Sequence, residues 1–175
     1  MGHTLVTRFT DEGYSTIQGL LESNGVKNVN KIPFGRSCDR TVANSILPYH
    51  VTMAHWKKPE DKKYLAHLSA FKFSEFKITF SKTVVWRGAE GSWILALSVK
   101  PTKGFRKTEK DLRKAFNKFF YVHKPHLTIS VSKDKKEIEA QREAIKSAFP
   151  ITLDVVGLDL YKIWNPVEFV RSYSR

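Results

Sequence analysis

The order of predicted secondary-structure elements occurs twice in this chain: strand, helix, strand, helix, strand, strand. Alternating apolar residues predict first-half strands over residues 4–9, 49–54, 76–80 and 84–86. The second-half strands are predicted over residues 93–99, 125–131, 151–155 and 167–173. Capping signals and apolar stripes predict helices that start near Ser15, Pro59, Thr108 and Asp134, with Gly25 ending the first. This duplication favours two α+β lobes related by a pseudo-two-fold axis.

We expect a single bilobal α+β domain over residues 1–175, with two antiparallel sheets facing a central cleft and helices outside. Hydrophobic residues make up 41% of the 175 residues, enough for a buried core. Cys38 is the only cysteine, so an intrachain disulfide is excluded. No apolar run is long enough to span a bilayer, and no secretory signal is visible. A cytoplasmic monomer is therefore expected.

The charge balance indicates the class of partner. Lysine and arginine number 30 against 17 acidic residues, a net charge of +13. Such a surplus attracts polyanions, and it favours RNA or nucleotides over an anionic membrane surface, because no predicted helix is both basic and strongly amphipathic with a wide exposed apolar face.

One short pattern, histidine–apolar–threonine–apolar, stands in the third element of each half. It reads His50-Val51-Thr52-Met53 in the first half and His126-Leu127-Thr128-Ile129 in the second. A random chain of this composition rarely contains the pattern even once. Because alternate residues of a strand share a face, each histidine is expected beside its threonine, with the apolar residues buried behind.

Two imidazoles and two hydroxyls around one space suit phosphoryl transfer at ribose. In-line displacement needs a base at the attacking oxygen and an acid at the leaving oxygen, and histidine serves both roles near neutral pH. Threonine hydroxyls can donate hydrogen bonds to the phosphate oxygens. A lone histidine in a strand is more often structural, but the matched pairs favour catalysis. A metal site is the sharper alternative, yet no Asp, Glu or Cys in phase completes a ligand set, so no metal or other cofactor is expected.

The two motifs and the duplicated order resemble the two-histidine (2H) phosphoesterase superfamily, whose LigT-like members include RNA 2′,3′-cyclic phosphodiesterases, first named 2′-5′ RNA ligases. The resemblance implies a bilobal fold with the active site between the lobes. It implies that His50 and His126 are the catalytic pair and that Thr52 and Thr128 hold phosphate. It further suggests that His126 activates water while His50 protonates the leaving ribose oxygen. The segment Ala54-His55-Trp56 departs from the apolar run ending in glycine of many LigT-like proteins.

Other residues are candidates for binding substrate. Lys124 and Ser130 have the same parity as His126, and Trp56 has the parity of His50, so phosphate or base contacts are expected from these three. Arg36 lies in the loop before the first motif and suits phosphate. Weaker candidates are Phe34, Arg40, Tyr161 and Trp164. Histidines that lack the pattern are taken as structural, and they are His3, His55, His67 and His123.

The leading functional hypothesis is a metal-independent enzyme that opens ribose 2′,3′-cyclic phosphate on RNA or a nucleotide. The alternatives are cleavage of 2′-5′ linked oligonucleotides, the reverse 2′-5′ ligation, and an RNA-binding module that only keeps the fold. Turnover of a cyclic nucleotide in chelator separates the enzymatic readings from the binding module.

We predict that RNA binding weakens steeply between low and physiological salt, because each neutralised phosphate releases a condensed counterion. A titration of labelled single-stranded RNA at several KCl concentrations should give a log–log slope of about −0.7 for each phosphate contacted. A slope near zero would mean that the surplus charge is not used on polyanions.

Overall fold

The computed structural model describes residues 2–26, 49–56, 66, 68, 71–88, 91–116, 124–163 and 168–174. The strands within these residues are β1 (Gly2–Phe9), β2 (Thr52–Trp56), β3 (Phe76–Arg87), β4 (Trp93–Lys100), β5 (His126–Ser132), β6 (Ile151–Ile163) and β7 (Glu168–Tyr173). The α-helices with described bounds are α1 (Asp11–Ser23), α3 (Lys103–Phe116) and α4 (Lys135–Ala144).

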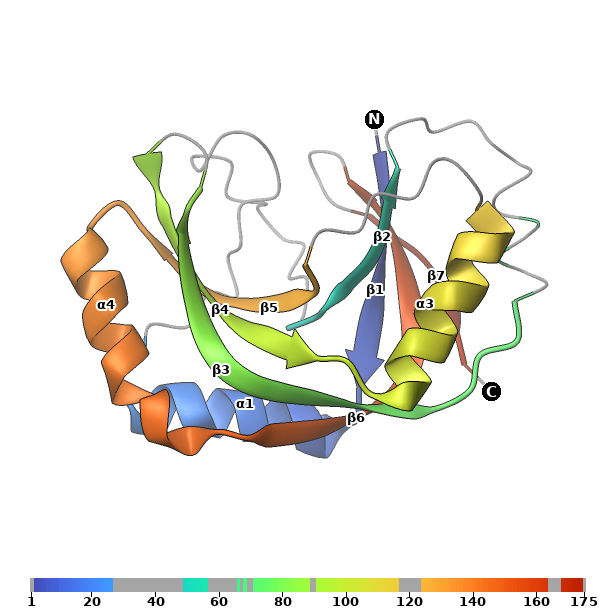
Figure 1. The fold of residues 1–175 in the computed structure, drawn as a ribbon. Helices are drawn as coiled ribbons and strands as arrows, with labels where there is room; N and C mark the ends of the chain where they lie inside the picture. The colour runs from blue at the N-terminus through green and yellow to red at the C-terminus, as the bar shows by residue number, and fades with distance from the viewer. Residues whose placement is uncertain are drawn as a thin grey trace.

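All of these strands join one antiparallel sheet in the order β2-β1-β6-β3-β4-β5, with β7 added on β6. Exchanging the halves of the chain swaps β1 with β4, β2 with β5 and β3 with β6, and this exchange leaves the order unchanged. The predicted α+β class and duplicated architecture are therefore confirmed. The two expected sheets are two arms of one open, curved sheet, joined where β3 pairs with β6 (Figure 1).

The duplication extends to irregularities in strand pairing. Met53 is an extra residue in β2 relative to β1, and Ile129 is the corresponding extra residue in β5 relative to β4. A second equivalent pair of β-bulges places Val156 in β6 and Ser81 in β3. Each bulge shifts the alternation of the side chains by one residue. The alternation therefore shifts at equivalent points in both arms.

Two predicted helix starts are wrong, and the reason is the same in both halves. The Thr10 hydroxyl accepts the Gly13 amide at 3.1 Å, and the Thr102 hydroxyl accepts the Phe105 amide at 3.2 Å, so α1 and α3 begin well before Ser15 and Thr108. In each half a threonine one or two residues after the strand caps the helix as soon as the chain turns.

Other helix signals are confirmed. Asp134 caps α4 by accepting the Lys136 amide at 2.8 Å. Gly25 follows α1 with φ of +63°, a left-handed conformation that favours glycine. The start predicted at Pro59 lies outside the described residues. No described helix is long and apolar enough to cross a membrane.

The third strand is longer than predicted. Residues 76–80 and 84–86 belong to one strand, β3, because the bulge at Ser81 shifts the alternation without ending the pairing. Phe80 therefore faces the core and is fully buried, whereas Val84 and Trp86 face the other side and are half-buried. Strand β6 likewise continues past the predicted end to Ile163.

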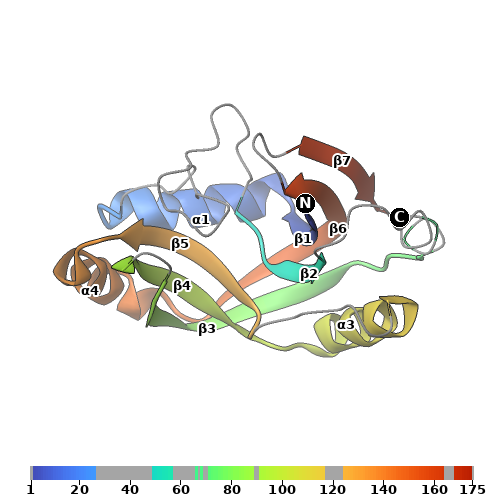
Figure 2. The ribbon, with the colours of Figure 1, turned by 90° about the horizontal axis from the view of Figure 1, so that it is seen from above.

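The core lies between the sheet and the helices that surround it (Figures 1 and 2). Helix α1 inserts Ile17 and Leu21, which are buried in the same cluster as Leu5 and Phe9 of β1. Helices α3 and α4 pack on β3 and on β3–β5 respectively. The helices thus cover the outside of the curved sheet and leave its inner face for the motif residues.

We predict that two glycine-to-alanine substitutions change stability in opposite directions. Gly19→Ala in α1 should raise the free energy of unfolding by about 0.5–1 kcal/mol, since an added Cβ meets nothing within 4 Å. Gly104→Ala in α3 should lower it by roughly 1–3 kcal/mol, since the Cβ would lie 2.5 Å from the Phe76 Cβ. Urea unfolding measures both values, and a stable Gly104→Ala variant would contradict the packing of α3 on β3.

Candidate active site

The two motifs meet where the edge strands β2 and β5 approach each other. An antiparallel bridge pairs Val51 with Leu127, the second residues of the two motifs, and both are fully buried. In an antiparallel pair the neighbours on each side also face one another, with Cα atoms about 4.5–5.5 Å apart. His50 is therefore placed opposite Thr128, and Thr52 opposite His126. Because side chains alternate, all four lie on the face opposite the two buried residues.

Each motif is held by the strand beside it. The Val51 carbonyl accepts the Thr7 amide at 3.0 Å, and the Val51 amide donates to the Thr7 hydroxyl at 2.9 Å. On the other arm, His126 pairs with Ser98 and Thr128 with Ala96. These contacts fix the backbone of both motifs on strands of the scaffold rather than on loops.

The bulges break the alternation on which two expected contacts depended. Ser130 follows the Ile129 bulge and pairs with Leu95, a fully buried core residue, and Ser130 itself is only 3% exposed. Ser130 therefore faces the core, whereas Thr128 faces the opposite side of the sheet. The expectation that Ser130 shares a face with His126 is wrong. In the same way the Met53 bulge interrupts the alternation between His50 and the backbone of Trp56, which pairs with His3.

The same bulge places His55 on the side of the sheet that carries His50 and Thr52, which we call the motif face. His55 pairs with Thr4, two residues along β1 from Val6, which pairs with Thr52. His55 is half-buried and lies on the motif face, although simple alternation along the strand puts it out of phase with His50.

The second histidine is oriented by its own backbone. His126 Nδ1 lies 2.7 Å from the Lys124 carbonyl oxygen. A carbonyl only accepts, so this hydrogen bond requires the proton on Nδ1, and Nε2 is then the basic nitrogen of the neutral imidazole. The Trp86 ring contacts the imidazole edge-on, with 4.8 Å between ring centres. His126 and Thr128 are half-buried, while His50 is buried at 8% exposure.

A cavity of about 680 Å³ opens beside the second motif. His126 and Thr128 line it together with Lys124. This placement agrees with the expectation that Lys124 lies close to His126. The remaining described lining residues are Val84, Trp86, Ile94, Ser98 and Pro125. A space of this size is in the usual range for small-molecule sites.

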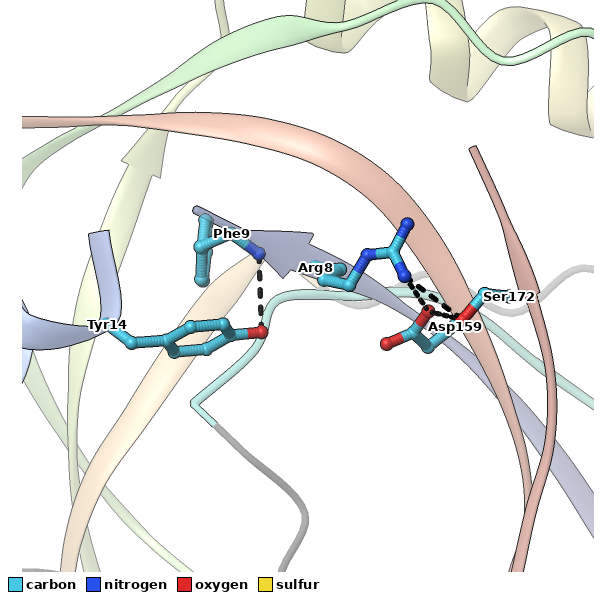
Figure 3. Close-up of polar contacts among 5 residues, drawn as sticks. All are labelled: Arg8, Phe9, Tyr14, Asp159 and Ser172. Atoms are coloured by element: carbon cyan, nitrogen blue, oxygen red, sulfur yellow. Dashed lines mark hydrogen bonds and ion pairs between the residues drawn. The ribbon is translucent and has the colours of Figure 1, made fainter. Parts of the chain in front are cut away.

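The first arm carries a charged cluster on the motif face (Figure 3). Arg8 Nη1 donates to Ser172 Oγ at 3.2 Å and lies 3.8 Å from Asp159 Oδ1, which accepts the Ser172 hydroxyl at 2.7 Å. Burial first, and then the nearby Asp159 charge, raise the pKa of Tyr161 to about 12. Tyr161 therefore keeps its hydroxyl proton throughout the neutral range.

Sequence comparison identifies the family. A model of the 2′-5′ RNA ligase superfamily matches residues 36–165. The chain belongs to this superfamily. The resemblance drawn from the two His–Thr motifs is thereby confirmed, and membership supports an enzyme that acts on phosphodiester bonds. No curated protein matches the chain in sequence.

Solved structures of the same shape span nearly the whole chain. Escherichia coli LigT complexed with 3′-AMP is 14% identical, with 98% of this chain and 96% of LigT covered and a TM-score of 0.57. Kluyveromyces marxianus Usb1 with uridine monophosphate is 11% identical, with 96% of both chains covered and a TM-score of 0.56. A further crystal structure of a phosphoesterase is 14% identical, with 99% and 97% covered and a TM-score of 0.58. At these identities the likeness shows the fold.

Several candidate residues lie outside the described part of this superfamily member. They are Phe34, Arg36, Cys38, Arg40, His67, His123 and Trp164. His3 is buried, as expected for a structural histidine, and burial together with the nearby Lys162 charge lowers its pKa. Within the described ranges, no group of three or more His, Cys, Asp or Glu could hold a metal ion.

Trp86 and Ser98 are site residues that the sequence interpretation missed. Ser98 is found beside His126 only once the β4–β5 register is known. Trp86 lies on β3, which is separated from β5 by β4, and the Ser81 bulge places it on the motif face. An isolated tryptophan in a strand carries no signal for either fact.

Proposed function

We propose that this protein is a metal-independent phosphodiesterase that opens ribose 2′,3′-cyclic phosphates on RNA or nucleotides. The observation that carries the proposal is the Val51–Leu127 bridge, which sets the two His–Thr motifs antiparallel on one face. One phosphate at this point has an imidazole on either side and a hydroxyl next to each. Two such imidazoles can supply both proton transfers of an in-line displacement.

The proposed reaction uses one histidine on each side of phosphorus. His126 takes a proton from water as the water oxygen forms a bond to phosphorus. The bond from phosphorus to one ribose oxygen breaks, and His50 protonates that oxygen, which leaves a nucleoside monophosphate. Thr52 and Thr128 donate hydrogen bonds to the phosphate oxygens that do not react. The direction of proton transfer follows the family resemblance.

Charge and relatives support a nucleotide substrate. The net charge of +13 attracts phosphates, and Lys124 is at the cavity. Structures of LigT and Usb1 that share this fold are described as complexes with 3′-AMP and uridine monophosphate. A nucleotide in the cavity beside His126 would set its phosphate near the motifs.

We predict that His50→Ala and His126→Ala each lower kcat/KM for 2′,3′-cyclic nucleotides by about a hundredfold or more, because a proton transfer is lost. Thr52→Ala and Thr128→Ala should cost less, since one phosphate hydrogen bond is lost while the proton path remains. The wild-type rate should be bell-shaped against pH, as one imidazole must be neutral and the other protonated. Turnover is measured in EDTA.

The control variant is His3→Gln, which changes a buried histidine outside the motifs and should leave kcat/KM near the wild-type value. Near-full activity of both motif-histidine variants would refute the mechanism. Turnover of 2′-5′ oligoadenylate or ADP-ribose cyclic phosphate, but not of cyclic nucleotides, would change the proposed substrate and leave the two-histidine mechanism in place. RNA binding without any turnover would favour the binding module.

The direction of proton transfer has a separate prediction. In the reverse-type reaction, a uridine 3′-(4-nitrophenyl phosphate) closes to the cyclic phosphate and expels nitrophenolate, a leaving group that needs little protonation. His50 then deprotonates the attacking ribose hydroxyl, while the acid role of His126 becomes dispensable. We expect His126→Ala to retain at least about tenfold more activity than His50→Ala on this ester. The opposite ranking would exchange the two roles.

A further inference from the structure

The two arms of the site match in register but differ in chemistry. Each position on the motif face of β3–β4 has a counterpart on β6–β1, defined by its pairing partner and the shared bulges. The differing pairs include Trp86 and Tyr161, Val84 and Asp159, Ile94 and Thr4, Ser98 and Arg8, and Lys82 and Gly157. A phosphate on the pseudo-two-fold axis is nearly symmetric, so these differences decide where the rest of a ligand lies.

The face of β6–β1 is already filled by its own side chains. Arg8 crosses β6 above Gly157, where an added Cβ would lie 2.5 Å from Nη2, and reaches Asp159 and Ser172 (Figure 3). The Asp159 side chain is 8% exposed and depends on these partners. A base ring stacked here would cover an ion pair whose groups already bind one another, and removing these charges from water is unfavourable.

The face of β3–β4 is open and mainly apolar. Val84, Trp86 and Ile94 line the cavity of about 680 Å³, and His126 and Thr128 line the same cavity. Trp86 is half-buried and contacts the His126 imidazole with the ring edge-on, so the indole is held next to the reacting group. Thr128 in turn faces His50 across the bridge, which connects the cavity to both histidines.

We propose that the β3–β4–β5 arm is the nucleobase subsite, with the base stacked on Trp86 between Val84 and Ile94. This inference rests on the proposed function, because it places the phosphate at the two motifs. The side chains of Val84, Ile94 and Pro125 offer no hydrogen bond to a base edge, and the polar lining residues Ser98 and Lys124 lie next to His126, at the phosphate end of the cavity. Stacking therefore contributes most of the affinity for the base. All four bases are accepted, and purines bind more tightly than pyrimidines because they stack over a larger area.

The test compares nucleotides with a ligand that lacks the base. Binding of nucleoside 3′-monophosphates and of 1-O-methylribose 3-phosphate is measured by calorimetry, and opening of the corresponding 2′,3′-cyclic phosphates is measured alongside. Trp86→Leu keeps an apolar side chain but removes the ring, and it should weaken nucleotide binding roughly tenfold or more. The base-free ligand should bind equally to both proteins, and Trp86→Phe should restore most of the nucleotide affinity.

Trp93→Leu is the matched control, because Trp93 lies on the neighbouring strand on the opposite face, where Lys135 covers its ring at 4.8 Å. It should leave the preference for nucleotides over the base-free ligand unchanged. Equal losses for both ligands in Trp86→Leu would mean that Trp86 only positions His126, and no loss would remove the stacking role; either result overturns the proposal. Because binding is measured separately, a wild-type protein that binds nucleotides through Trp86 without turnover would refute the proposed function alone.

Discussion

The pairing of Val51 with Leu127 is the contact on which the site depends. These residues belong to opposite edges of the sheet and to opposite halves of the chain, yet both are fully buried at one antiparallel bridge. Burying the two apolar residues at the centre of the motifs directs the four flanking polar side chains to the other face. Core packing and the geometry of the candidate site are therefore two results of the same alternation.

The duplicated sheet explains why each half supplies one histidine to the proposed site. Exchanging the halves gives the same strand order read from the other edge, and the bulges at Met53 and Ile129 recur at the last residue of each motif. Two equivalent arms deliver equivalent groups to the two sides of a central point, as in-line displacement at phosphorus requires. The arms then diverge in side chains, with the Arg8–Asp159 cluster on one and the Trp86 cavity on the other.

Sequence patterns predicted the α+β class, the duplication and the family, because these depend on local periodicity and on a short motif. They predicted the burial of Val51 and Leu127 for the same reason. Alternation gives parity but not register, so the bulges that turned Ser130 to the core and His55 to the motif face were invisible. Trp86 was missed because its neighbours come from pairing across β4. The early starts of α1 and α3 depend on threonine caps that compete with equally good signals at Ser15 and Thr108.

A crystal structure of the protein with a uridine–vanadate complex is the most direct test of a phosphate held between two motifs. We expect vanadium between His50 and His126, with one imidazole nitrogen of each at hydrogen-bond distance from opposite apical oxygens. The hydroxyls of Thr52 and Thr128 should contact the remaining oxygens. Vanadate bound by one motif alone, with the other histidine out of hydrogen-bond reach, would contradict the shared site.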